Sequence, residues 1–244
     1  MNIRWYLISL ILAATLLLSA CNINVVNGSG KVTAESRAVS NFHAVSFTGF
    51  GELTLVQGET EALTIETDDN LLPYIKTTVS QGTLTIGFGD GALTPILRPT
   101  QSIRYHLTVK TLTDLELSGA GTVEATELTA DHLALTESGA GEIKVAKLAA
   151  SDVTVDLSGA GAVQLAGEVT RQSVTLSGLG DYAAGDLASQ TAEVTLSGAG
   201  AATVWVSEHL TTDLSGAGTI KYYGSPQLNS NSSGVGKVQS LGAK

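Results

Sequence analysis

The sequence has little of several residue types, and each shortage narrows the classes of protein it can be. It holds a single cysteine, Cys21, so an intramolecular disulfide is excluded. Only 13 of its 244 residues are Lys or Arg, against 23 Asp or Glu, which gives a formal net charge of −10. No basic stripe is present to contact a phosphate backbone, so nucleic acid is not expected as a partner. What remains is the composition of one sizeable domain with an acidic surface.

The one long apolar run lies at the start of the chain. Arg4 precedes an apolar stretch at 5–20, which ends in Leu18-Ser19-Ala20-Cys21. A basic start, a short apolar core and small residues before a cleavage site are typical of a secretion signal, and the run is short for a membrane span. We therefore expect a cleavable signal peptide at residues 1–20.

Leu-Ser-Ala-Cys resembles the bacterial lipobox, in which the Cys is lipidated after cleavage. The resemblance implies a lipid on Cys21 and a location in the bacterial cell envelope, with Asn22 after the Cys favouring the outer membrane. An ordinary signal with a Cys there by chance is the alternative. The polar residues that follow predict a lipid-anchored tether at 21–40.

The tetrapeptide Ser-Gly-x-Gly recurs along the second half of the chain. Its copies begin at Ser118, Ser138, Ser158, Ser177, Ser197, Ser215 and Ser233. The steps between successive copies are 20, 20, 19, 20, 18 and 18 residues. Self-similarity at a period near twenty predicts a solenoid, in which every repeat stacks on the previous one. The blades of a β-propeller need about 40–50 residues, so the period is too short for that fold.

Apolar and polar residues alternate on both sides of each copy, which is typical of strands with one buried face. Each coil therefore holds a strand, a Gly-x-Gly corner and a second strand. We attribute the glycines to positive φ at the corner, and we expect the small residue between them, such as Ala160, to point inward. Stacked strands would pair in parallel about 4.8 Å apart, which places the motifs in one line.

The predicted fold is all-β: a parallel β-helix, or solenoid, with coils of roughly 20 residues. A single domain spans 41–244, with a less regular first part at 41–110 and regular coils at 111–236. Thr48-Gly49-Phe50-Gly51 is a degenerate early copy of the corner. Strands are expected at 52–56, 63–66 and 103–110, and a hairpin at 76–88 around Gln81-Gly82. Beyond Gly224 polar residues replace the apolar columns, as the free end of a solenoid requires.

Two irregular segments lie in the first part of this domain. Asp68-Asp69-Asn70 is expected to cap a short helical turn at 71–75. Residues 87–100 hold several Gly and Pro residues, and they predict a loop.

Several of these segments together resemble one bacterial family. They are Phe42-His43-Ala44-Val45, Gly49-Phe50-Gly51, Asp69-Asn70-Leu71-Leu72-Pro73-Tyr74-Ile75, Gly82-Thr83-Leu84 and the serial Leu-Ser-Gly-Ala-Gly. From residue 41 to 224 the chain is similar to the family called "putative auto-transporter adhesin head, GIN domain". The resemblance implies a right-handed β-helix on exported, often lipid-anchored proteins.

No catalytic residues are assigned. A catalytic serine is needed once, beside a positioned base, whereas the motif serine recurs in every coil. Gly87-Phe88-Gly89-Asp90 and Gly178-Leu179-Gly180-Asp181 superficially resemble calcium-binding repeats, but those work as tandem nine-residue units. We therefore expect no metal site and no cofactor.

Two features are candidates for surface binding. A polar column stands six residues before the motif serines: His132, Asp152, Arg171, Thr191 and His209. It is either a solvated face with weak ion pairs or a strip that faces a ligand. Glu137 breaks the column of Leu that precedes the motif, in a register that points inward. Either a bulge turns it to solvent, or it is a buried carboxylate with a specific partner and marks a site.

The sequence thus predicts a non-enzymatic, lipid-anchored envelope protein whose rigid β-helix acts in binding, adhesion or scaffolding. Its partners would be the membrane, through the lipid on Cys21, and a glycan or an envelope protein. A polysaccharide-active enzyme and an envelope-signalling accessory protein are the alternatives. Three or more carboxylates converging beside a deep groove would favour the enzyme, and a flat face rich in Ser and Thr would favour the binding protein.

Overall fold

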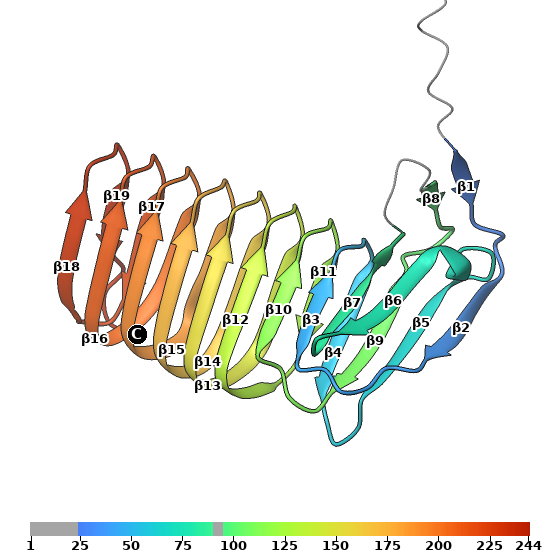
Figure 1. Cartoon of the computed structure of the whole chain (residues 1–244). Helices are drawn as coiled ribbons and strands as arrows, with labels where there is room; N and C mark the ends of the chain where they lie inside the picture. The colour runs from blue at the N-terminus through green and yellow to red at the C-terminus, as the bar shows by residue number, and fades with distance from the viewer. Residues whose placement is uncertain (1–23, 90–94) are drawn as a thin grey trace, which may run out of the picture.

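The structure is a computed structural model, and it describes residues 24–89 and 95–244. The expectations on the signal peptide, Cys21 and Asn22 lie outside the described residues. The strands form one stack of flattened coils that runs from an irregular N-terminal end to an open C-terminal end (Figure 1). Among the described residues, no helix is both long enough and apolar enough to cross a membrane.

The regular secondary structure of the described residues consists of nineteen strands and one 3-10 turn. Before the regular coils they are β1 Val25–Asn27, β2 Val32–Arg37, β3 Ala44–Phe47, β4 Glu52–Gln57, β5 Ala62–Asp68, η1 Leu72–Tyr74, β6 Ile75–Ser80, β7 Thr83–Phe88, β8 Ile96–Arg98 and β9 Arg104–Val109. The regular coils contain β10 Asp114–Leu117, β11 Thr122–Ala125, β12 Leu128–Glu137, β13 Glu142–Leu157, β14 Ala162–Leu176, β15 Asp181–Leu196, β16 Ala201–Leu214, β17 Thr219–Tyr223, β18 Gln227–Ser232 and β19 Lys237–Ser240.

Each coil has two walls that meet at the Gly-x-Gly corner. The pre-corner wall is built, in order, from β7, β3, β10, β12, the second halves of β13 to β16, and β18. The post-corner wall is built from β9, β4, β11, the first halves of β13 to β16, β17 and β19. Strands β13 to β16 continue around the base from one wall into the other, so 17 strands form one sheet.

The register confirms the stacked parallel coils that the repeat predicts. The residues before successive motifs pair in parallel along the pre-corner wall: Leu117, Glu137, Leu157, Leu176, Leu196 and Leu214. All six are buried between the walls. The motif itself continues the ladder, since the backbone N–H of Ser138 donates to Leu117 O over 3.1 Å. Parallel strands buried on one face form a continuous core along the axis, and that core holds the stack together.

The corner glycines are required for a reason other than the one the sequence indicated. The glycines of the regular motifs do not adopt positive φ. Instead the backbones of successive corners touch: a Cβ on Gly159 would lie 2.0 Å from Gly139 O, and one on Gly178 would lie 2.0 Å from Gly159 O. No side chain fits at that distance, so the repeat conserves glycine for close backbone approach.

The residue between the two glycines was expected to point inward, and this expectation is wrong. Ala120, Ala140, Ala160, Ala199 and Ala217 are exposed. Leu179 and Val235, which occupy the same position, are 69% and 85% exposed. The middle residue of the corner points to solvent because both of its neighbours face the preceding coil.

The early corner at Thr48-Gly49-Phe50-Gly51 is confirmed, in a coil that the chain visits out of order. Strands β3 and β4, on either side of this corner, pair with β10 and β11 of the next coil. On their other side they pair with β7 and β9, which come later in the sequence. The chain therefore starts one coil inside the stack, builds the end coil, and then crosses back to continue.

The N-terminal end of the stack is covered by antiparallel strands. Strand β2 pairs with β5, β5 with β9, and β6 with β7. The predicted hairpin at 76–88 is confirmed, and Gln81 and Gly82 both have positive φ at its turn. The end is closed by apolar residues of the turn and its flanks, because Leu71, Leu72 and Ile75 are buried.

Residues 25–37 were expected within a tether, and the structure corrects this for the described part. They form β1 and β2, with β1 paired to β8 and β2 to β5. Strand β8 also lies inside the predicted loop at 87–100, of which residues 90–94 are not described. The tether was predicted from the polar residues of this segment. They are frequent here because β1 and β2 are half exposed, and the alternation of apolar and polar residues in these strands is weak.

Asp68-Asp69-Asn70 does not cap the following turn, whose first residue has no side-chain cap. These three side chains hold the segment at 27–31 instead. Asn70 Oδ1 accepts from Ser29 N over 2.9 Å, and Asp69 Oδ1 accepts from Ser29 Oγ over 2.6 Å. A run of short polar residues therefore fixes a distant loop rather than the local turn.

Asp68 is buried where the end of β5 meets the loops that follow β1 and β8. Its Oδ1 accepts from Gly30 N and Thr100 Oγ1, and its Oδ2 accepts from Thr100 N, each over 2.8 Å. Burial alone raises the pKa of Asp68, but the hydrogen bonds from Thr100 and Gly30 outweigh it and hold the pKa below its usual value. The carboxylate thus joins the end of β5 to the loops that follow β1 and β8.

Candidate functional site

The predicted polar column is present as a line of paired residues at the base of the coils. His132 pairs with Asp152, and Asp152 with Arg171. His132 Nδ1 lies 3.0 Å from Asp152 Oδ2, and Arg171 Nε lies 3.7 Å from Asp152 Oδ1. His132 and Arg171 are 70% and 69% exposed, so the contact of each with Asp152 contributes only about 0–1 kcal/mol. The geometry is that of a solvated charged edge.

His209 stands in the same column but apart from these three residues. It pairs with Thr191 on one side and Gln227 on the other. Arg171 is two coils away, about 9.6 Å by the ladder spacing. The structure therefore brings together His132, Asp152 and Arg171, and leaves His209 among uncharged neighbours in its column.

Glu137 is buried, so the expectation that a bulge turns it to solvent is wrong. Its exposed fraction is 0%, and it keeps its place in the ladder between Leu117 and Leu157. Its Oε1 accepts from Gly141 N over 3.3 Å, whereas its Oε2 has no partner among the described residues. The side chain lies beneath the next corner, where a Cβ on Gly161 would be 2.4 Å from Glu137 Cδ. A ligand on the outer surface does not reach it.

The outward side chains of the pre-corner wall form a flat surface, which we call the hydroxyl wall. It consists of Thr136, Thr154, Asp156, Ser173, Thr175, Glu193, Thr195, Thr211 and Asp213. The alternation of strands places them on the solvent side, opposite the buried Leu and Val columns. Along a ladder, hydroxyl residues separate carboxylates: Thr136 stands between Asp156 of the hydroxyl wall and Glu116 of β10, which are about 9.6 Å apart along the axis.

At its N-terminal end the hydroxyl wall is hollowed. A cavity of about 450 Å³ opens over β3, β7, β10 and β12. Its floor has the small side chains Ala44 and Ala134, with His43, Asp114 and Glu116 around it. Ser46 Oγ donates to Glu116 Oε2 over 2.8 Å, so this carboxylate is held by the adjacent coil. The arrangement offers hydrogen-bonding groups around a shallow apolar floor.

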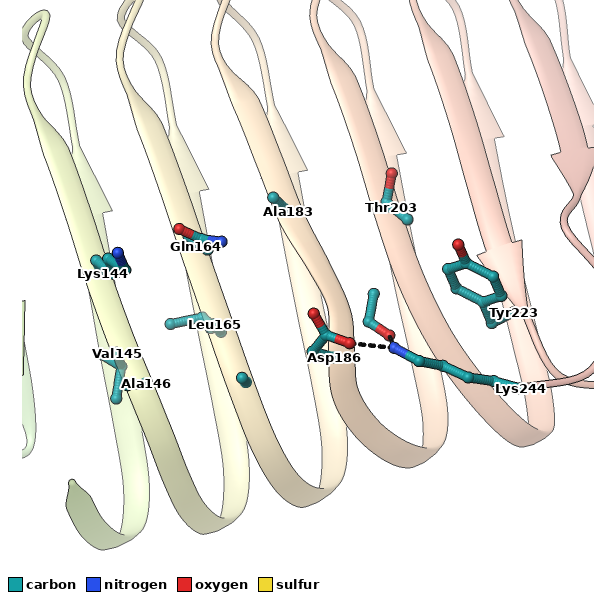
Figure 2. Close-up of a pocket in the computed structure, with 12 residues that line it drawn as sticks. Lys144, Val145, Ala146, Gln164, Leu165, Ala183, Asp186, Thr203, Tyr223 and Lys244 are labelled. Carbon is teal, nitrogen blue, oxygen red and sulfur yellow. Dashed lines mark hydrogen bonds and ion pairs between the residues drawn. The ribbon is translucent and has the colours of Figure 1, made fainter. Parts of the chain in front are cut away.

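A second cavity, of about 430 Å³, lies in the post-corner wall over β13 to β17. It exists because β15 bulges: Ala184 pairs with Val204, but Ala188 pairs with Trp205, so residues 185–187 have no partner in β16. Bulges of this kind bend a strand away from its neighbour. Gly185 and Asp186 stand at the bend, and Lys244 reaches them from the C-terminal end of the chain (Figure 2).

Sequence reasoning missed this second cavity, although a signal was present. The step between motifs falls from 20 to 18 residues after Ser197. A shorter coil stacked on a longer one must leave residues of the longer coil unpaired, and here these include residues 185–187. The step length gave no indication of which wall would bulge.

The described residues contain no group of three or more His, Cys, Asp or Glu placed to hold a metal ion. What the structure offers is a stack of parallel coils with a rigid core, an extended polar wall and open cavities in both walls. This defines the class of protein as a parallel β-solenoid with large outer surfaces.

Within that class the chain belongs to the family described as "Putative auto-transporter adhesin, head GIN domain", which matches residues 41–226. This confirms the family resemblance in the sequence. Among curated proteins, no sequence matches the chain.

Solved structures share the fold over nearly the whole described chain. A "putative adhesin" from Bacteroides fragilis is similar at 25% identity with a TM-score of 0.84, covering 88% of this chain and 100% of that one. A "putative lipid binding protein" from Parabacteroides distasonis is similar at 22% identity and TM-score 0.75, covering 89% and 100%. A "putative adhesin" from Parabacteroides merdae is similar at 22% identity and TM-score 0.71, covering 89% and 99%.

Proposed function

We propose that this protein is a non-enzymatic binding module of the bacterial cell envelope, anchored by a lipid on Cys21, whose hydroxyl wall contacts a glycan or an envelope protein. The observation that carries the proposal is the hydroxyl wall, a flat ladder of Thr and Ser on a rigid sheet. Hydroxyls and carboxylates held at regular spacing by a rigid sheet can form hydrogen bonds with the many hydroxyls of a sugar or with the polar rim of a protein–protein interface. The adhesin descriptions of the family and of the Bacteroides fragilis protein support it.

The wall favours binding over hydrolysis. A glycan-cleaving site needs two carboxylates on either side of one bond, about 5–9.5 Å apart, with one of them made more basic by its surroundings. Within one ladder of the hydroxyl wall, Asp156 and Asp213 are three coils apart, about 14 Å, with Thr175 and Thr195 between them. Glu193 and Asp213, in neighbouring ladders, are about 8 Å apart, but both are exposed on an open face rather than set on either side of an enclosed groove. The hydroxyl wall therefore supports recognition along its length rather than chemistry at one point.

The folded N-terminal segment adds a consequence for the anchor. Strand β1 begins at Val25, four residues after Cys21. Four extended residues span at most about 14 Å, so a lipid on Cys21 would hold the N-terminal end of the stack close to the bilayer.

The binding role is tested with Thr154→Lys and Thr175→Lys together, which place two long cations on the hydroxyl wall. Both residues are exposed, so the fold should be unchanged. We expect the parent chain to bind purified envelope glycans or envelope proteins of its own cell, and the double variant to lose about tenfold or more in affinity, as unmatched charges at an interface do. Thr170→Lys, exposed on the same strand as Thr175 but outside the hydroxyl wall, is the matched control. Equal binding by the double variant and the parent would reject the hydroxyl wall as the contact surface.

The anchor is tested with Cys21→Ala in the native cell. We expect the parent to be in the membrane fraction and the variant to be released, because lipidation requires the thiol. Asn22→Ala keeps the thiol and should remain with membranes. Retention of Cys21→Ala in the membrane fraction would show that the lipid on Cys21 is not the anchor.

A further inference from the structure

One end of the cavity in the post-corner wall is built around a cation, Lys244, while Lys144 lines the opposite end. Lys244 Nζ donates to Gly185 O and to Asp186 Oδ1. The same nitrogen lies 5.1 Å from the ring centroid of Trp205 and 5.1 Å from that of Tyr223. A carboxylate, a carbonyl and two aromatic faces around one ammonium are the groups that recognise alkylammonium ions in proteins. We call this arrangement the ammonium cleft.

The ammonium cleft is fixed from inside the core. Tyr182 Oη donates to Gln172 Oε1 over 3.0 Å, and Gln172 Nε2 donates to Ser189 Oγ over 2.8 Å. Ser189 Oγ in turn donates to Trp205 O over 2.8 Å. All three side chains are buried, so this chain of hydrogen bonds fixes the backbone of Trp205 at the point where β15 bulges. The cleft is therefore held open by its own structure.

The residue that fills the ammonium cleft is held much less firmly. Lys244 is 30% exposed and Asp186 is 75% exposed, so their ion pair is open to solvent. Residues 241–244 belong to no strand, and backbone hydrogen bonds to Tyr222 O and from Gly224 N hold them. Because the cleft is rigid and Lys244 is lightly held, a competing ammonium can displace Lys244 from the cleft.

We propose that the ammonium cleft binds a lysine side chain of a partner polypeptide, and that Lys244 is its internal competitor. Lys244 shows that the cleft accepts a lysine stem and its ammonium. Beyond Lys244 the cavity continues over Ala183 and Gln164, which leaves room for the chain that carries a partner lysine. The formal charge of −10 attracts polypeptides rich in lysine. The ammonium cleft lies on the wall opposite the hydroxyl wall, so this proposal does not rest on the proposed function.

Trp205 reports directly on the ammonium cleft. The chain has two tryptophans, Trp5 and Trp205, so in the full chain with Trp5→Phe all tryptophan emission comes from the cleft. In this background Lys244→Met removes the ammonium and keeps the length of the side chain. The probe is Nα-acetyl-lysine methylamide, and the neutral probe is the corresponding norleucine compound.

We expect saturable binding of the lysine probe to the Lys244→Met variant, and binding at least about tenfold weaker to the chain that keeps Lys244, because an intramolecular competitor acts at high effective concentration. Asp186→Asn added to Lys244→Met should weaken the probe at least about tenfold, as loss of a charge-assisted hydrogen bond does. Asp181→Asn, at the start of the same strand, is the matched control and should bind as its parent does.

Any one of four results would overturn the proposal. The first is no saturable response of Trp205 in Lys244→Met, and the second is equal binding with and without Asp186→Asn. The third is equal binding of the norleucine probe. Cadaverine distinguishes a free alkylamine from a lysine side chain in a polypeptide. If its affinity equals that of the lysine probe, the cleft binds free amines, and the proposal of a polypeptide partner is overturned. Thermal melts of each variant check that the fold is intact.

Discussion

Gly159→Ala is expected to destabilise the protein by about 3 kcal/mol or more, although it adds one methyl group. The new Cβ would lie 2.0 Å from Gly139 O, well inside contact distance. Relief requires the two corners to separate, and that strains the bonds from Ala160 N to Gly139 O and from Ala162 N to Gly141 O, both 2.9 Å. Thermal or urea unfolding of the variant measures the loss.

Two controls separate this cause from others. Ala160→Ser changes the exposed middle residue of the same corner and should alter stability by less than about 0.5 kcal/mol. Gly30→Ala is a positive-φ glycine with no atom within 4 Å of the added Cβ, so it should cost only about 1–2 kcal/mol of backbone strain. If Gly159→Ala costs no more than Gly30→Ala, close approach of the corners is not what requires glycine.

Asp68→Asn should destabilise the N-terminal end by about 2–4 kcal/mol near neutral pH, because each of three hydrogen bonds loses its charge and a charged bond contributes about 1 kcal/mol more than a neutral one. The amide keeps one acceptor but turns its NH2 toward a backbone donor, Thr100 N or Gly30 N. Denaturant unfolding measures the change. Ser36→Ala, on the exposed side of β2, serves as a control with little expected effect.

The effect of Asp68→Asn should depend on pH in one direction. The pKa of Asp68 is lower in the folded protein than its unfolded value of about 3.9, so the carboxylate contributes its full stability above that value. As pH falls from about 4 through the lower folded pKa, the parent loses this contribution and the variant has none to lose. The difference between the two should therefore shrink in acid. A difference that is the same at pH 7 and pH 3 would contradict the role of the charge.

The coils could be predicted from sequence because their information is local and repeated. A single corner motif reveals little, but copies in register fix strand, corner, pairing direction and inward face together. Even so, the reason for glycine was wrong, since a contact between neighbouring backbones leaves no trace in the residues that make it. Gly139 and Gly159 look the same whether a turn or a touching coil requires them.

The N-terminal end was predicted least well because its contacts join segments far apart in the chain. Asn70 and Ser29 meet across about 40 residues of sequence, and each alone reads as an ordinary loop residue. The same limit applied to the candidate site. The pairing of His132 with Asp152 followed from the period, whereas the contact of Asp186 with Lys244 depends on a bulge and on where the chain returns.

The stack of coils has a mechanical consequence. The last coil, with β18 and β19, touches one neighbour and is exposed along its length, whereas the N-terminal end is tied by Asp68 and Asn70. Tension applied at the C-terminal side would therefore peel coils one at a time from that end. Each coil of about 20 residues would lengthen the molecule by about 60 Å before the next gives way. A sideways load on either wall is instead shared by every ladder at once. The same molecule would therefore lengthen in steps when pulled along its axis and resist shear across it.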